Sequence, residues 1–100
     1  MSKAGKREED LAVKYFQDKG FTALNTSDEG FPDLIVTKDG RIEFFAEVKS
    51  GETSFISWSQ RQYHKRLLEK GFITKGVRVI DGDVKIEEER TWPHPEPSEN

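Results

Sequence analysis

The sequence predicts one domain of the α/β (α+β) class, a mixed sheet flanked by helices with the element order α–β–β–β–α–β–β. Three observations predict this class. The chain of 100 residues is too short for two independent hydrophobic cores. Two segments place apolar residues at helical spacing, and each ends at a glycine. Short apolar runs between and after them are joined by Asp-Gly dipeptides, which are typical of hairpin turns.

The first predicted helix covers residues 6–19 and ends at Gly20. Its apolar stripe consists of Leu11, Ala12, Tyr15 and Phe16. At 100° per residue, Glu8 lies on the centre line of this stripe, in the first turn. An N-terminal carboxylate favoured by the helix dipole is the ordinary explanation for such a residue. A functional carboxylate directed toward the sheet is the alternative, and both stay open at this point.

Three strands are expected next, at residues 21–25, 33–37 and 42–49. The second and third are joined by Lys38-Asp39-Gly40, a hairpin signal. The polar, glycine-containing stretch between the first and second strands is expected to be a loop.

The second predicted helix covers residues 57–70 and ends at Gly71. Ser57 followed three residues later by Gln60 has the spacing of a capping box. One helical face collects Gln60, Tyr63, His64, Leu67 and Leu68. This face is therefore expected to pack on the sheet.

A second hairpin follows, with strands at residues 77–80 and 84–86 around Asp81-Gly82. The folded domain is expected to cover residues 1–89. Residues 90–100 hold three of the four prolines of the chain, so we expect them to form a disordered or loosely draped tail.

The register of the first hairpin decides which side chains share a sheet face. A two-residue turn would place Asp33 opposite Ala46, and a three-residue loop with a bulge would place it opposite Phe45. Only the second gives one wholly apolar face, which a half-buried antiparallel pair needs. That face would hold Leu34, Val36, Ile42, Phe44, Ala46 and Val48. We therefore predict the three-residue loop or another odd-length connection, with Asp33 and Glu47 on the same face.

This register brings Asp33, Glu47 and Lys49 together at one end of one face. Two converging carboxylates repel each other unless a cation lies between them, and hard oxygen ligands suit Mg²⁺ or Mn²⁺. A nearby lysine can orient a water molecule or stabilise charge that grows on a phosphate. Each piece alone also has an ordinary explanation, because Pro-Asp is a common turn and Glu-x-Lys a common surface pair. The joint placement favours phosphodiester hydrolysis.

Pro32-Asp33 followed by Glu47-Val48-Lys49 resembles the PD-(D/E)XK nuclease motif, and within that superfamily the chain is most similar to the small VRR-NUC domains. Further similarities are Glu8, Gly30-Phe31 and the Ser57/Gln60 spacing. The resemblance implies a restriction-endonuclease-like αβββαβ core and divalent-metal-dependent cleavage of DNA. The C-terminal hairpin strand is an addition to that core. Holliday-junction resolvases of the archaeal type share the layout, which implies branched DNA as substrate and a homodimer.

The resemblance also implies a role for each site residue. Asp33 and Glu47 would be metal ligands, with the carbonyl of Val48 as a third. Lys49 would position the attacking water.

The remaining residues around the site have less direct roles in this prediction. Glu8 would act on a metal or through a metal-bound water, and Gln60 would support the site or contact the phosphate. For His64 a packed or hydrogen-bonded position is favoured over metal binding, and for Trp58 packing is favoured over base stacking. Arg61 is the first basic residue to test for contact with DNA.

Charge and composition set limits on function. The net charge is −3, but residues 87–100 carry five Glu against one Arg, so residues 1–86 hold a net charge of +1. Acidity is thus no argument against DNA. The absence of cysteine excludes disulfides, a thiolate zinc site and a cysteine nucleophile. No motif indicates a nucleotide cofactor, and neither a membrane span nor a signal peptide is visible. We expect a cytoplasmic, intracellular protein.

The main hypothesis is therefore a Mg²⁺- or Mn²⁺-dependent endodeoxyribonuclease that acts as a homodimer on branched DNA such as Holliday junctions. The first alternative keeps the same site but nicks duplex DNA or cuts flaps. The second is a binding module for branched or duplex DNA that has no catalytic activity.

Overall fold

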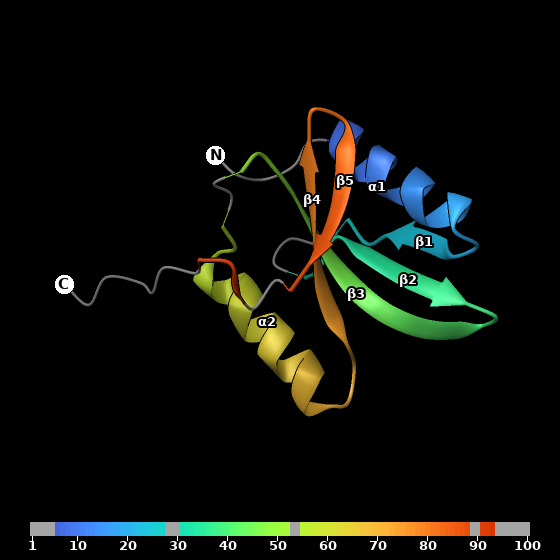
Figure 1. The fold of residues 1–100 in the computed structure, drawn as a ribbon. Coiled ribbons are helices and arrows are strands. Elements are labelled where there is room, and N and C mark those ends of the chain that lie inside the picture. Colours follow the sequence, from blue (N-terminus) through green and yellow to red (C-terminus); the bar gives the residue numbers. More distant parts are fainter. Residues whose placement is uncertain (1–5, 28–30, 53–54, 89–90, 94–100) are drawn as a thin grey trace.

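The computed structural model describes residues 6–27, 31–52, 55–88 and 91–93. Its elements are α1 (Lys6–Asp18), β1 (Thr22–Asn25), β2 (Leu34–Lys38), β3 (Arg41–Ser50), α2 (Trp58–Glu69), β4 (Thr74–Ile80) and β5 (Asp83–Glu87). This order confirms the predicted succession of helices and strands, and Figure 1 shows the arrangement.

One five-stranded sheet with the order β1-β2-β3-β4-β5 forms the centre of the molecule. Neighbouring strands are antiparallel except β3 and β4, which are parallel and are connected through α2. The mixed sheet and the extra hairpin of β4 and β5 confirm the α+β class.

The two helices lie on opposite faces of the sheet (Figure 1). Ala12 and Phe16 of α1 belong to the buried core together with Leu34, Val36, Ala46, Val48, Val77 and Val79 of the strands. On the other face, Gln60 and His64 of α2 contact Glu47. Since successive strand residues point to opposite faces, α1 covers the apolar side and α2 covers the side that carries the charged residues.

The turn between β2 and β3 has two residues, so the expected three-residue loop is wrong. Lys38 pairs directly with Arg41, and both turn residues have positive φ, 52° at Asp39 and 78° at Gly40. Two successive residues in this region form a turn whose twist matches that of the flanking strands, and Asp-Gly is a preferred sequence for it. The local sequence thus selects the tighter turn.

A β-bulge restores the face that the shorter turn would have lost. Thr37 pairs with Ile42 but Val36 pairs with Phe44, which leaves Glu43 as an extra residue in β3. Beyond the bulge Ile35, and not Asp33, lies opposite Phe45.

Two consequences follow for the predicted faces. Ile42 leaves the apolar face and is 47% exposed, so its predicted burial is wrong. The register continues from the Leu34–Ala46 pair, so Asp33 and Glu47 lie on the same face, as predicted.

The helix α2 begins as the sequence predicts. Ser57 is its N-cap, and both hydrogen bonds of the capping box with Gln60 are present. The predicted apolar face is only partly correct, because Tyr63 and Leu68 are 37% and 42% exposed and His64 is the buried residue of this helix. The helix therefore lies on the sheet mainly through polar side chains.

The predicted C-terminal tail is packed at its start. Trp92 is 3% exposed and lies over Gly76 of β4, so the folded part of the chain extends at least to Pro93 and not only to residue 89. Residues 94–100 lie outside the described part. Among the described residues, neither helix has the length and apolar character needed to cross a membrane.

Candidate active site

Asp33 lies immediately before β2, and its position is fixed on two sides. Its backbone carbonyl accepts a hydrogen bond from the N–H of Thr26 at 2.9 Å, and its Oδ2 accepts one from the N–H of Val48 at 2.8 Å. The carboxyl group also lies close enough to that of Glu47 for the two to affect each other's charge. Burial and the neighbouring Glu47 raise the pKa of Asp33 to about 7. Both effects disfavour the ionised carboxylate, whereas a bound cation would favour it and lower the pKa of Asp33.

Glu47 lies in the middle of β3 and is almost fully buried. Its Oε2 accepts a hydrogen bond from Nε2 of Gln60 at 3.1 Å, and its Oε1 lies 3.3 Å from Nε2 of His64. His64 itself is completely buried, which confirms the prediction of a hydrogen-bonded helix histidine. Two side chains of α2 thus orient one carboxylate of the sheet.

Lys49 points to the same face two residues later and is 4% exposed. Its Nζ donates to Oε1 of Gln60 at 3.3 Å. The same oxygen accepts the backbone N–H of Ser57 at 2.8 Å, as one half of the capping box. Gln60 therefore caps its own helix and also bridges Glu47 to Lys49, which ties the position of the site to the start of α2.

The backbone of Val48 contributes to the same corner. Its N–H points toward the β2 side and holds Asp33, whereas the N–H of Phe45 points toward β4 and donates to Ile73. Because the N–H and C=O of one strand residue point to the same strand edge, the Val48 carbonyl faces the edge where β2 has ended and Asp33 lies. This carbonyl and the two carboxyl groups form a corner of hard oxygen atoms.

Such a corner suits Mg²⁺ or Mn²⁺ in its chemistry. Magnesium is usually held by one or two carboxylates and keeps several of its waters. Asp33 is the more exposed of the two carboxyl groups, since Glu47 is 1% exposed. An ion and an anionic substrate would therefore approach from the side of Asp33.

The structure does not join Glu8 to this pair. No group of three or more His, Asp or Glu side chains that could hold a metal ion occurs within residues 6–27, 31–52, 55–88 and 91–93. Glu8 is partly buried in the first turn of α1, and the next residue, Glu9, accepts a hydrogen bond from Asn25 at the end of β1. The first turn of α1 thus lies at the end of β1, and an action of Glu8 through water stays a prediction.

Aromatic rings border the site on the Asp33 side. The Phe31 ring meets Phe45 and Tyr63 edge to face, with ring centroids 5.6 and 5.9 Å apart. Phe45 is buried and contacts Phe72 in turn. These rings lower the local exposure to water, which is consistent with the raised pKa of Asp33. The sequence gives no signal for them beyond the aromatic residues themselves.

The far side of the same face carries Arg78, whose contacts within the protein the sequence does not reveal. Arg78 lies next to Lys49 in the parallel register and donates to Glu87 at 3.0 Å and to the Gly51 carbonyl at 2.6 Å. The Trp92 ring lies 4.8 Å from the Arg78 guanidinium carbon. A buried arginine with two acceptors and a stacked ring is a well-satisfied structural group.

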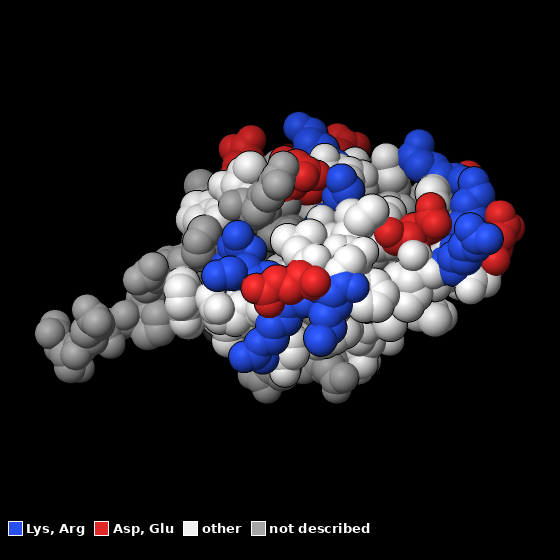
Figure 2. All heavy atoms as spheres, turned by 90° about the horizontal axis from the view of Figure 1, so that it is seen from below, with Lys and Arg blue, Asp and Glu red and all other residues white. Residues whose placement is uncertain are grey.

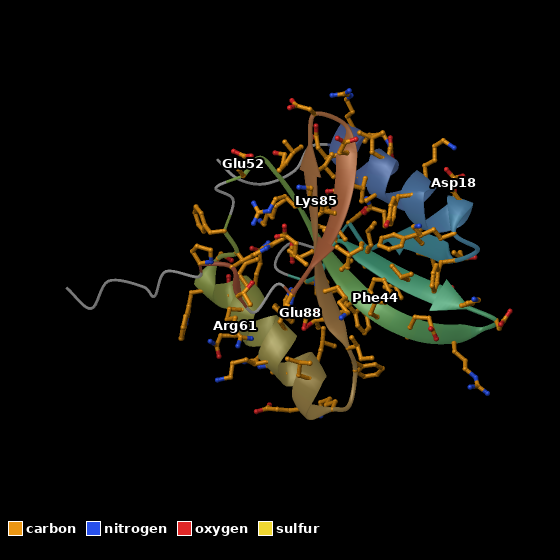
Figure 3. The ribbon with its side chains drawn as sticks, in the orientation of Figure 1. Asp18, Phe44, Glu52, Arg61, Lys85 and Glu88 are labelled. Carbon is orange, nitrogen blue, oxygen red and sulfur yellow. The ribbon has the colours of Figure 1, made fainter. Side chains whose placement is uncertain are left out.

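Surface charge on the described residues is mixed. Figure 2 shows Lys and Arg gathered in two places, over α2 and at the tip of the β2–β3 hairpin, in each case with acidic groups beside them. On α2 the exposed basic residues are Lys65 and Arg66, with Lys70 following the helix and Glu69 as the acid. Arg61, marked on the same helix in Figure 3, has buried Nε and Nη1 atoms without a hydrogen-bond partner.

Comparison with models of known protein families and with the sequences of curated proteins gives no match to this chain.

Proposed function

We propose that this protein is a divalent-metal-dependent DNA endonuclease of the VRR-NUC type within the PD-(D/E)XK superfamily, with a restriction-endonuclease-like core. The observation that carries the proposal is the Asp33–Glu47 pair: two carboxyl groups in contact on one sheet face, with Lys49 two residues beyond Glu47. Gln60 orients Glu47 and Lys49 by hydrogen bonds, and the N–H of Val48 holds Asp33. This donor set supports phosphodiester hydrolysis assisted by Mg²⁺ or Mn²⁺.

Each residue has a definite task in this proposal. Asp33 and Glu47 would hold the ion together with the Val48 carbonyl, and the ion would supply Lewis acidity toward the scissile phosphate. Lys49 would orient the attacking water by its ammonium group, and Gln60 would hold the side chains of Lys49 and Glu47 in position through its hydrogen bonds. His64 would hold the second oxygen of Glu47.

The substrate proposed is branched DNA, with the Holliday junction as the first candidate. A domain of this length offers little surface for gripping a junction, so we propose a homodimer that brings two sites to one substrate. Phe55 and Phe72, which are 40% and 38% exposed, are candidates for the dimer contact. The exposed cations of α2 would lie near the phosphate backbone.

Cleavage of a substrate panel tests this function. Labelled duplex, flap and four-way junction DNA are incubated with the protein and Mn²⁺, and Lys49→Met is compared with Lys14→Met, which removes an exposed lysine of α1 on the opposite side of the sheet. We expect preferred cleavage of the junction, a loss of about 100-fold or more in Lys49→Met, and a small change in Lys14→Met. Equal cleavage by the two variants would remove Lys49 from the mechanism.

The main competing function is a DNA-binding module without catalysis. Calorimetric titration with Mn²⁺ separates the two, because a binding module has no need for the carboxylate pair. Binding of Mn²⁺ that disappears in Glu47→Gln supports the nuclease, whereas DNA binding without any Mn²⁺ binding favours the module.

A further inference from the structure

The region after β5 makes close contacts with the sheet face that carries the candidate site. Gly76 pairs with Glu47, and a Cβ atom placed on Gly76 would lie 2.6 Å from Cζ2 of Trp92. The indole therefore rests directly on the backbone of β4, beside the site strand. Only glycine at position 76 allows this approach.

Polar contacts hold the indole in this place. Its Nε1 donates to Oε1 of Glu87 at 2.6 Å, and Glu87 also accepts from Nε of Arg78 at 3.0 Å. Arg78 stacks on the Trp92 ring and donates through Nη1 to the Gly51 carbonyl. The first residue after β3 is thereby linked to the C-terminal region.

Pro93, the residue after Trp92, holds the other end of the β3–α2 connection. The N–H of Ile56 donates to the carbonyl of Pro93 at 3.0 Å, and Ile56 is completely buried. Ile56 directly precedes Ser57, whose capping box fixes Gln60. A chain of contacts thus runs from Trp92 and Pro93 to the residue that bridges Glu47 and Lys49.

We propose that Trp92 is a positioning residue of the candidate site: by anchoring both ends of the β3–α2 connection, it sets the start of α2 and thereby the place of Gln60 between Glu47 and Lys49. The proposal rests on the proposed function for its effect on catalysis. Its structural part, the control of Ser57 and Gln60 by Trp92, can be measured without any cleavage assay.

Hydrogen exchange and cleavage kinetics of matched variants test the proposal. Trp92→Leu is compared with Phe16→Leu, which removes an equally buried ring from the opposite face. We expect the amides of Ile56 and Gln60 to exchange about tenfold faster in Trp92→Leu, at matched global stability, than in Phe16→Leu. On junction DNA, kcat should fall by about 10- to 100-fold in Trp92→Leu with KM within about twofold of wild type.

Two further variants distinguish positioning from general loss of stability. Trp92→Phe keeps a ring over Gly76 and Arg78, so it should restore most of the amide protection and of kcat. Gly76→Ala pushes the indole away and should reproduce the Trp92→Leu effects, but it should add nothing in a Trp92→Ala background. If Trp92→Leu does not fold, the same measurements on Trp92→Phe and Gly76→Ala test the proposal.

The outcomes separate the two proposals. Unchanged exchange at Ile56 and Gln60 in folded Trp92→Leu or Gly76→Ala overturns the positioning role, whatever the cleavage result. Faster exchange at these amides in Trp92→Leu, combined with no DNA cleavage by the wild type, upholds the control of Gln60 by Trp92 and rejects the nuclease function. Equal loss of kcat in Phe16→Leu and Trp92→Leu also overturns positioning.

Discussion

Replacing Asp33 with Asn should stabilise the metal-free protein at alkaline pH. The native pKa of Asp33 is about 7, against an ordinary value of 3.8, because burial and Glu47 both disfavour its charge. Between these two values the native state binds a proton that the unfolded chain has released. The free energy of unfolding of the wild type must therefore fall as the pH rises from about 4 to about 7. Asparagine does not titrate, and its side-chain oxygen can still accept from the N–H of Val48.

The size of the effect follows from the shift. A difference of about three pKa units corresponds to about 4 kcal/mol when the carboxylate is fully ionised. Water reaches part of Asp33, which screens its charge, so we expect about 2 kcal/mol at pH 8. Near pH 4 the wild type and Asp33→Asn should have nearly equal stability.

Urea denaturation with EDTA at pH 4, 6 and 8 measures this difference. Asp39→Asn is the matched control, since Asp39 is exposed in the hairpin turn and asparagine tolerates its positive φ. If Asp33→Asn is no more stable than wild type at pH 8, or if Asp39→Asn also loses the pH dependence of the wild type, burial and Glu47 do not disfavour the charge of Asp33 as described. Addition of Mg²⁺ should stabilise the wild type more than Asp33→Asn, as a separate test of the metal.

Three further stability predictions follow from single contacts. Ser57→Ala should lower the free energy of unfolding by about 1 kcal/mol in urea, because the N–H of Gln60 loses its acceptor, while exposed Ser59→Ala should change it little. Leu34→Ala should cost about 2–5 kcal/mol because Leu34 is fully buried, and a smaller loss would mean that the core collapses around the cavity. Gly40→Ala should cost about 1 kcal/mol from backbone strain at φ 78°, visible as a lower thermal midpoint, and an unchanged midpoint would argue against the tight turn.

The elements and the shared face of the site residues could be predicted because both depend on local patterns. The stripe of α1, the positions of the two hairpins and the Ser57/Gln60 spacing depend on a few neighbouring residues, and the structure confirms them. The pairing register could not be predicted, because the bulge at Glu43 adds one residue and no pattern in the sequence marks it. The shared face of Asp33 and Glu47 is nevertheless predictable, because a bulge and a loop with an odd number of residues have the same effect on side-chain alternation.

Contacts between segments that are distant along the chain could not be predicted from the sequence. The proline-rich composition of residues 90–100 predicts a disordered tail. In the structure, however, Trp92 is buried against Gly76, and burial of its large ring stabilises this position. The sequence places Gln60 and His64 on the face of α2 that packs on the sheet, but it does not reveal that both contact Glu47 of β3. Buried polar groups need partners, and those partners come from other elements of the fold.

Metal-dependent cleavage of DNA by the Asp33–Glu47 pair can be tested with two glutamate variants of β3. A labelled four-way junction is incubated with Mn²⁺ and with wild type, Glu47→Gln or Glu43→Gln, two variants that change one glutamate of the same strand, buried in the first case and exposed in the second. We expect cleavage by wild type and by Glu43→Gln, and a loss of about 100-fold or more in Glu47→Gln. Equal cleavage by the two variants, or no cleavage by wild type with either Mn²⁺ or Mg²⁺, would contradict it.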